Sequence, residues 1–114
     1  MAKAYKIITR ADWDLALKAG RFEGAAIDLR DGYIHLSTAA QAPETARVHF
    51  AGQAGLVLLR IDTGALGPRL KWEPSRGGAL FPHLYAPLDP LLVEAVTDMP
   101  LDADGIPQLG TLEP

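Results

Sequence analysis

The chain of 114 residues contains no cysteine. This absence excludes disulfide bonds, thiolate metal ligands and a cysteine nucleophile. Positive charge is also in short supply, because 11 lysines and arginines face 14 acidic residues and leave a net charge of −3. Non-specific nucleic-acid binding needs a basic face that displaces counterions, so we do not expect it here. A local phosphate site stays open, since it needs only one or two arginines and some backbone amides.

Long apolar runs are missing as well. No segment approaches the roughly twenty apolar residues of a membrane span, and the first ten residues lack the apolar run of a signal peptide. We therefore expect a cytoplasmic protein with no membrane partner. The three histidines have no metal-binding spacing such as HExxH, and no cysteine can complete a zinc set, so we expect no metal site.

The length and an ordinary hydrophobic content of 48% predict a single domain over residues 1–114. Its core should cover about residues 4–99, and the tail of residues 100–114, spaced by proline and glycine, should be extended and fray. Two helices are predicted in the N-terminal half, at 10–19 and 39–49. Four or five strands follow mostly later, which favours an α+β fold around one bent β-core over alternating βαβ units.

Local signals place these helices. Thr9 is the predicted N-cap of the first helix, with Asp12 three residues on, and Gly20 ends it. Thr38 and Gln41 predict a capping box at the start of the second helix. The segment 21–32 between them reads as a loop with some extended character, closed by an Asp-Gly turn.

The stretch "YIHLS" at residues 33–37 is predicted to be a strand with two different faces. Ile34 and Leu36 share the core face, whereas Tyr33, His35 and Ser37 share the other. That second face has the composition of a cleft lining, in which an imidazole can donate or accept a hydrogen bond. A half-exposed structural histidine is the equal alternative. His49, near the end of a helix, is interpreted as structural.

The stretch "KWEPSRGGALFPHLY" at residues 71–85 is the second candidate for a ligand site. Ser75, Arg76 and the glycines after Pro74 can form a turn whose amides and guanidinium bind an anion. A plain hairpin with a solvated arginine is the alternative.

In the strand that follows this turn, Phe81, His83 and Tyr85 share one face, and Pro82 predicts an edge strand or a strand start. Trp72 and Glu73 precede the turn, and the combination suits a planar, anionic ligand. We expect the turn and this strand to lie across one pocket from His35.

Three segments together, "YKIITRADWDLALKAGRFEG", "DGYIHLSTAAQAPETARVHFAG" and "LKWEPSRGGALFPHLYAPL", resemble domain-of-unknown-function family 952 over roughly residues 4–99. More distantly, the "IHLS" strand that leads into a helix is similar to the RNA 2′-phosphotransferase branch of the ADP-ribosyltransferase-like superfamily. The resemblance implies a split, strongly bent β-structure with a cleft. It places His35 on a family histidine that contacts the ribose region of NAD, and Ser37 on the family serine. The chain is shorter than those transferases and lacks their additional N-terminal domain.

Two functions are consistent with these features. The first is an ADP-ribosyltransferase-like enzyme that acts on NAD or on a phosphorylated or ADP-ribosylated ribose, with NAD as the candidate cofactor. The second is a noncatalytic binding module for a nucleotide-like or other small anionic ligand. The predicted catalytic residues are His35, Glu73 and His83. The predicted ligand-binding residues are Tyr33, Ser37, Trp72, Ser75, Arg76 and Tyr85.

Overall fold

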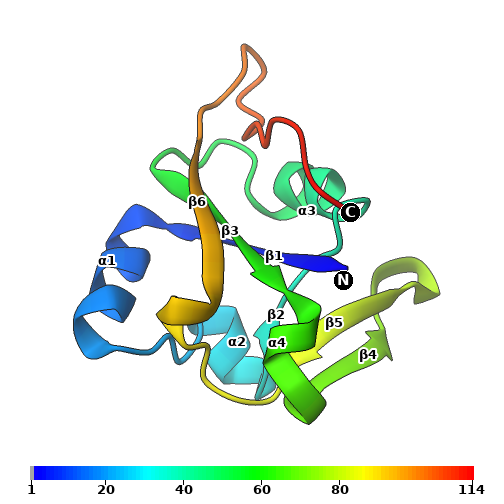
Figure 1. Cartoon of the computed structure of the whole chain (residues 1–114). Helices are drawn as coiled ribbons and strands as arrows, with labels where there is room; N and C mark the ends of the chain where they lie inside the picture. The colour runs from blue at the N-terminus through cyan, green and yellow to red at the C-terminus, as the bar shows by residue number, and fades with distance from the viewer. Residues whose placement is uncertain (1) are drawn as a thin grey trace.

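The computed structural model describes residues 2–114, except for the side chain of Arg76. Its β-structure is divided into two antiparallel sheets of three strands each (Figure 1). The first sheet has the order β1 (Lys3–Thr9), β3 (Leu56–Asp62) and β6 (Val93–Met99). The second sheet has the order β2 (Ile34–His35), β5 (Leu80–Leu84) and β4 (Leu70–Pro74).

A backbone bridge joins the two sheets. The N–H of Tyr5 in β1 donates to the carbonyl of Ser37 at 2.7 Å, and the N–H of Ser37 donates back at 2.9 Å. Because Ser37 lies just beyond β2, this bridge brings the start of the second sheet to β1. The β-core is therefore split into two joined sheets, and the predicted α+β class is confirmed.

The helices are short and lie around these sheets. They are α1 (Arg10–Ala19), α2 (Ala26–Asp31), α3 (Ala42–His49) and α4 (Thr63–Leu66), with 3-10 turns η1 (Gly67–Arg69), η2 (Arg76–Gly78) and η3 (Pro90–Leu92). Figure 1 shows α1 at one end of the molecule and the β4–β5 hairpin at the other. No helix in residues 2–114 is long and apolar enough to cross a membrane.

The hydrogen bonds predicted at both helix starts form, but the second helix begins three residues later than the predicted residue 39. The N–H of Asp12 donates to Oγ1 of Thr9 at 3.0 Å, and Gly20 ends α1 in the left-handed conformation. Thr38 and Gln41 form the reciprocal capping box, with bonds of 3.0 and 3.2 Å. The box encloses one turn, so regular α3 starts only at Ala42.

The segment predicted as a loop at 21–32 contains α2, so that prediction is wrong. The helix has Ala25 at its N-cap, a residue without a capping side chain, which is why the sequence signal is weak. Asp28, three residues after Ala25, supplies the other half of a capping box, because its Oδ2 accepts the N–H of Ala25 at 2.8 Å. Gly24, directly before Ala25, has φ +126°, and a Cβ at this position would lie 2.8 Å from the Cβ of Asp28. Glycine at this position therefore lets the chain pass close to the capping carboxylate.

The strand that contains Pro82 is also placed differently from the prediction. β5 lies in the middle of its sheet, between β2 and β4, and is not an edge strand. The carbonyl of Pro82 accepts the N–H of Leu36 at 3.0 Å on the β2 side. Since N–H and C=O of a strand residue point to the same side, the donor that proline lacks falls on this side as well. β2 is only two residues long, so the missing N–H of Pro82 removes little of the hydrogen bonding between β2 and β5.

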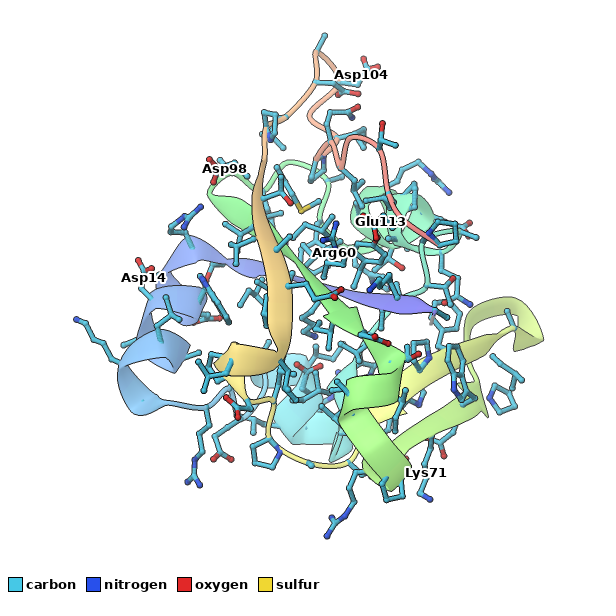
Figure 2. The ribbon with its side chains drawn as sticks, in the orientation of Figure 1. Asp14, Arg60, Lys71, Asp98, Asp104 and Glu113 are labelled. Carbon is cyan, nitrogen blue, oxygen red and sulfur yellow. The ribbon has the colours of Figure 1, made fainter. Side chains whose placement is uncertain are left out.

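The C-terminal tail packs back on the molecule instead of fraying. The N–H of Lys3 donates to the carbonyl of Pro114 at 3.2 Å, and the hydroxyl of Tyr5 donates to the carbonyl of Glu113 at 2.6 Å. Leu109 and Leu112 add apolar contacts to the core. In Figure 2, Glu113 lies beside Arg60, which it meets at 3.2 Å.

The core is double, because the strands β1 and β3 bury both faces. The larger cluster takes one face of each strand, together with α1 and the second sheet; its strand members are Ala4, Ile8, Val57, Leu59, Ile61, Ile34 and Leu84. The smaller cluster takes the other face, α3 and the tail; its strand members are Tyr5, Ile7, Leu56, Leu58 and Met99. By the alternation of β1, Lys6 lies on the face of the larger cluster, between Ala4 and Ile8. A lysine at such a position needs a partner, and the partner defines the site described next.

Candidate functional site

His35 and His83 face each other across the β2–β5 pair. They are register partners in the two strands, and their ring centroids lie 5.6 Å apart in an edge-to-face arrangement. Both line one cavity of about 300 Å³. Ile34 and Leu36 are buried as predicted, and the His35 side chain is 29% exposed. The strand itself is shorter than the predicted residues 33–37, because β2 contains only Ile34 and His35.

The cavity combines a polar and an apolar lining. Its polar side chains are Lys6, His35, Ser37, Thr45, His49, Ser75 and His83. Its apolar ones are Ile7, Ile27, Leu36, Ala42, Phe50 and Phe81, with the ring of Tyr5. Such a mixture suits a small ligand with an apolar or planar part and one polar or anionic group.

Two carboxylates from α2 hold the imidazole of His35. Its Nδ1 lies 2.6 Å from Oδ1 of Asp28, and its Nε2 lies 3.0 Å from Oδ2 of Asp31. The backbone N–H of His35 also donates to Oδ1 of Asp28 at 3.0 Å. Both ring nitrogens of His35 therefore lie within hydrogen-bonding distance of a carboxylate oxygen.

Asp28 is the centre of this network. Besides the bonds to His35 and Ala25, its oxygens lie 3.0 and 2.9 Å from Nζ of Lys6. Burial acts to raise the pKa of Asp28, but the hydrogen bonds from His35 and the charge of Lys6 outweigh it and lower that pKa to about 2. Burial lowers the pKa of Lys6, and Asp28 partly offsets the effect. The carboxylate therefore stays ionised and keeps both partners in place.

Glu73 is the carboxylate that holds the second histidine, His83. Its Oε1 accepts the hydroxyl of Tyr85 at 2.6 Å and lies 2.9 Å from Nδ1 of His83. These hydrogen bonds lower the pKa of Glu73, and the bond to Glu73 raises the pKa of Tyr85 to about 12. With Nδ1 of His83 committed to a carboxylate, Nε2 is the nitrogen available to a ligand.

The ring of Tyr33 completes the cluster. It stacks on His83 with centroids 4.1 Å apart and an angle of 17°, and it is tilted against His35 and Tyr85 at 4.6 and 5.2 Å. Tyr33 and Tyr85 do not line the histidine cavity. They line a second cavity, of about 250 Å³, on the other side of this aromatic group.

The other predicted site residues divide into three groups. Ser37 and Ser75 line the histidine cavity, and Ser37 shares a hydrogen bond of 3.0 Å with Thr45. Trp72 is 43% exposed and lines neither cavity, because alternation along β4 turns it away from the face of Glu73. The side chain of Arg76 lies outside the part of the chain that the structure describes. His49, interpreted from sequence as structural, borders the histidine cavity from α3.

Sequence reasoning missed Asp28 and Asp31 and gave Lys6 no role of its own. One signal was present: a lysine interrupts the apolar alternation of β1 on its buried face, and a buried lysine requires a counter-ion. Nothing local indicates that the counter-ion comes from α2. Among the described residues, no group of three or more histidines, aspartates and glutamates is placed to hold a metal ion.

The chain matches one protein family over most of its length. The family model described as "Protein of unknown function (DUF952)" matches residues 7–99, and the protein belongs to that family. No curated protein matches the chain.

Solved structures of one relative share the whole fold. The crystal structure of protein CC0527 from Caulobacter crescentus has 59% sequence identity to this chain, covers 95% of both chains and superposes with a TM-score of 0.93. The solution NMR structure of CC0527 has a TM-score of 0.87 at 59% identity, with 96% of this chain and 95% of that chain covered.

Proposed function

We propose that the protein is an enzyme that breaks or transfers a phosphoryl or glycosyl bond at a phosphorylated ribose. The observation that carries this proposal is the pair of carboxylate-held histidines in one cavity. Two imidazoles within 5.6 Å, each oriented through a carboxylate, can serve one reaction as proton donor and proton acceptor. Lys6 also lines the cavity, and its ammonium group holds Asp28 in place.

The roles follow from the contacts. His35, held between Asp28 and Asp31, is suited to donate a proton or to hold a ribose hydroxyl. His83 donates from Nδ1 to Glu73, so its Nε2 is suited to accept a proton. Both Asp28 and Glu73 act as positioning residues.

The size of the cavity bears on the substrate. About 300 Å³ lies at the small end of ligand pockets, so a phosphorylated ribose or a single nucleotide matches it better than the whole dinucleotide NAD. A split β-core is part of the architecture that the resemblance to the ADP-ribosyltransferase-like superfamily implies. We infer a distant relationship to that superfamily, with NAD as the second choice of substrate.

A noncatalytic binding module is the second candidate, and one observation favours it. Both ring nitrogens of His35 already lie within 3.0 Å of carboxylate oxygens, so a substrate must displace Asp31 before His35 can act. A site that only binds ligand needs no such displacement. Binding and turnover therefore have to be measured separately.

The test is a panel of nucleoside 2′- and 3′-monophosphates, ribose 5-phosphate and NAD, followed by chromatography for products and by calorimetry for binding. The informative variant is His83→Asn, because the asparagine amide can still donate to Glu73 while Nε2 is lost. For an enzyme, turnover falls by about 10²–10⁴ in this variant. Asp14→Asn, an exposed change on α1, is the control and keeps the wild-type rate (Figure 2). Saturable binding without any product supports the binding module, and neither binding nor turnover with any member of the panel overturns the proposal.

A further inference from the structure

The second cavity has a lining that differs from that of the histidine cavity. The residues that line it include two tyrosines, two acidic residues and several apolar residues: Tyr33, Tyr85, Glu23, Asp28, Leu29, Ile34, Leu84, Ala86 and Pro87, with Gly32. No lysine, arginine or histidine is among the described residues that line it. Its volume of about 250 Å³ is enough for a small organic molecule.

The two tyrosines form an aromatic corner. Their ring centroids lie 5.2 Å apart and the planes meet at 51°. His83 covers one side of Tyr33 in the stacked arrangement, and Tyr33 borders the second cavity as well. Burial raises the pKa of Tyr33, and the bond to Glu73 raises that of Tyr85. Both rings therefore stay neutral phenols near neutral pH, with the electron-rich faces that attract cations.

A carboxylate lies at the same cavity. Glu23 is exposed and meets Arg21 at 2.6 Å, a surface pair of the kind that contributes little and rearranges readily. An entering cation can take the place of the guanidinium of Arg21 beside Glu23. Asp28 already has Lys6 and His35 as partners, so Glu23 is the group that remains for a ligand.

We propose that this second cavity is a separate binding site for a small organic ammonium ion, held by the faces of Tyr33 and Tyr85 and by the carboxylate of Glu23. Aromatic faces combined with a carboxylate are the recurrent means of recognising alkylated ammonium groups. An anionic ligand finds no cationic side chain among the described residues of this lining.

The site is coupled to the histidine cavity through its own walls. Tyr33 stacks on His83, and Tyr85 donates to the same oxygen of Glu73 that holds Nδ1 of His83. A ligand that moves either tyrosine therefore changes the orientation of His83. The coupling rests on the proposed function of the histidine cavity, whereas binding of the cation does not.

The experiment is an NMR titration of the full chain with choline and tetramethylammonium chloride, against sodium chloride at equal ionic strength. We expect saturable shifts of the ring signals of Tyr33 and Tyr85 with both ammonium ions. The uncharged isostere 3,3-dimethyl-1-butanol has the shape of choline without its charge and should bind roughly tenfold more weakly, as expected for loss of a cation–π contact. Equal affinity for the neutral isostere, or shifts that follow sodium chloride, would overturn the proposal.

Three variants test whether the ammonium ions bind specifically in this cavity. Tyr33→Leu should abolish saturable binding of the ammonium ions. Glu23→Gln is an exposed change with little effect on stability, and it should weaken this binding several-fold. Glu113→Gln is the matched control, because Glu113 is also an exposed glutamate paired with an arginine, but on the tail (Figure 2). Wild-type affinity in Glu23→Gln, or an equal loss in Glu113→Gln, contradicts a specific site. The titration contains no nucleotide, so failure of the nucleotide panel does not affect this result.

Discussion

The imidazoles of His35 and His83 lie edge to face across a single register pair of two antiparallel strands, with centroids 5.6 Å apart. Each is held through Nδ1 by a carboxylate from a different element, Asp28 from α2 and Glu73 from β4. Each carboxylate accepts a hydrogen bond at Nδ1 and so fixes the orientation of its ring. The histidine pair therefore depends on Asp28 and Glu73, and these two residues are the natural places to test it.

Removal of the Asp28 charge should be strongly destabilising. In Asp28→Asn the ammonium group of Lys6 stays buried without its counter-ion, and we expect the free energy of unfolding to fall by about 3–5 kcal/mol. Urea unfolding followed by circular dichroism measures this change. The double variant Lys6→Met with Asp28→Asn should recover part of the loss, and Glu23→Gln in the exposed pair with Arg21 should cost less than about 1 kcal/mol. Equal losses in the single and double variants would show that Lys6 is not the cause.

Stability should fall at acid pH because of the same carboxylate. Folding lowers the pKa of Asp28 from 3.8 to about 2, so above pH 4 both states are ionised and the full contribution is present. As pH falls from 4 toward 2, the unfolded chain takes up a proton that the folded chain does not, and a contribution on the order of 2 kcal/mol is lost. Unfolding free energies of the wild type and of the double variant, measured from pH 6 to 2, should converge in this window. Parallel curves would contradict the assignment.

The hydrogen bond between Tyr85 and Glu73 should be visible in the titration of the tyrosines. The hydrogen bond to Glu73, together with burial and the charge of Glu73, raises the pKa of Tyr85 to about 12. Glu73→Gln removes the charge and weakens the bond, so this pKa should fall toward 10.0. The absorbance of phenolate against pH reports the change. Tyr85→Phe should remove the same titration step and thereby identify it. If the steps in wild type and Glu73→Gln coincide, the bond does not persist in solution.

The packed tail predicts a stability cost that a fraying tail would not have. Tyr5→Phe removes the hydroxyl that donates to the carbonyl of Glu113 and should destabilise the protein by about 1 kcal/mol. Deletion of residues 109–114 should cost more, because it also removes the contacts of Leu109 and Leu112. Asp104→Ala at the exposed tip of the tail (Figure 2) should change stability by less than about 0.5 kcal/mol. Thermal unfolding of the four proteins measures these differences; an unchanged Tyr5→Phe midpoint would mean that the tail is detached.

Local sequence was enough to predict the features that depend on neighbours along the chain. The cap of Thr9 on α1 and the box of Thr38 with Gln41 form as predicted, because a cap needs partners only two or three residues away. The buried strand at 56–62 and the burial of Ile34 and Leu36 also follow from the sequence. A strand alternates its side chains with a fixed period, wherever its partner strand comes from.

Which polar groups meet depends on the folded chain as a whole. Asp28 caps its own helix, neutralises Lys6 and orients His35, and no local pattern relates these three residues to one another. The position of Pro82 also depends on distant contacts, because its missing donor is tolerated in a central strand only where the adjacent strand β2 is short. Tyr33 likewise lines the second cavity and not the histidine cavity. Strand order, sheet pairing and the burial of a charge are set by contacts between distant segments. The lysine in β1 shows in the sequence that a counter-ion is required, but only the packing of α2 against β1 supplies it.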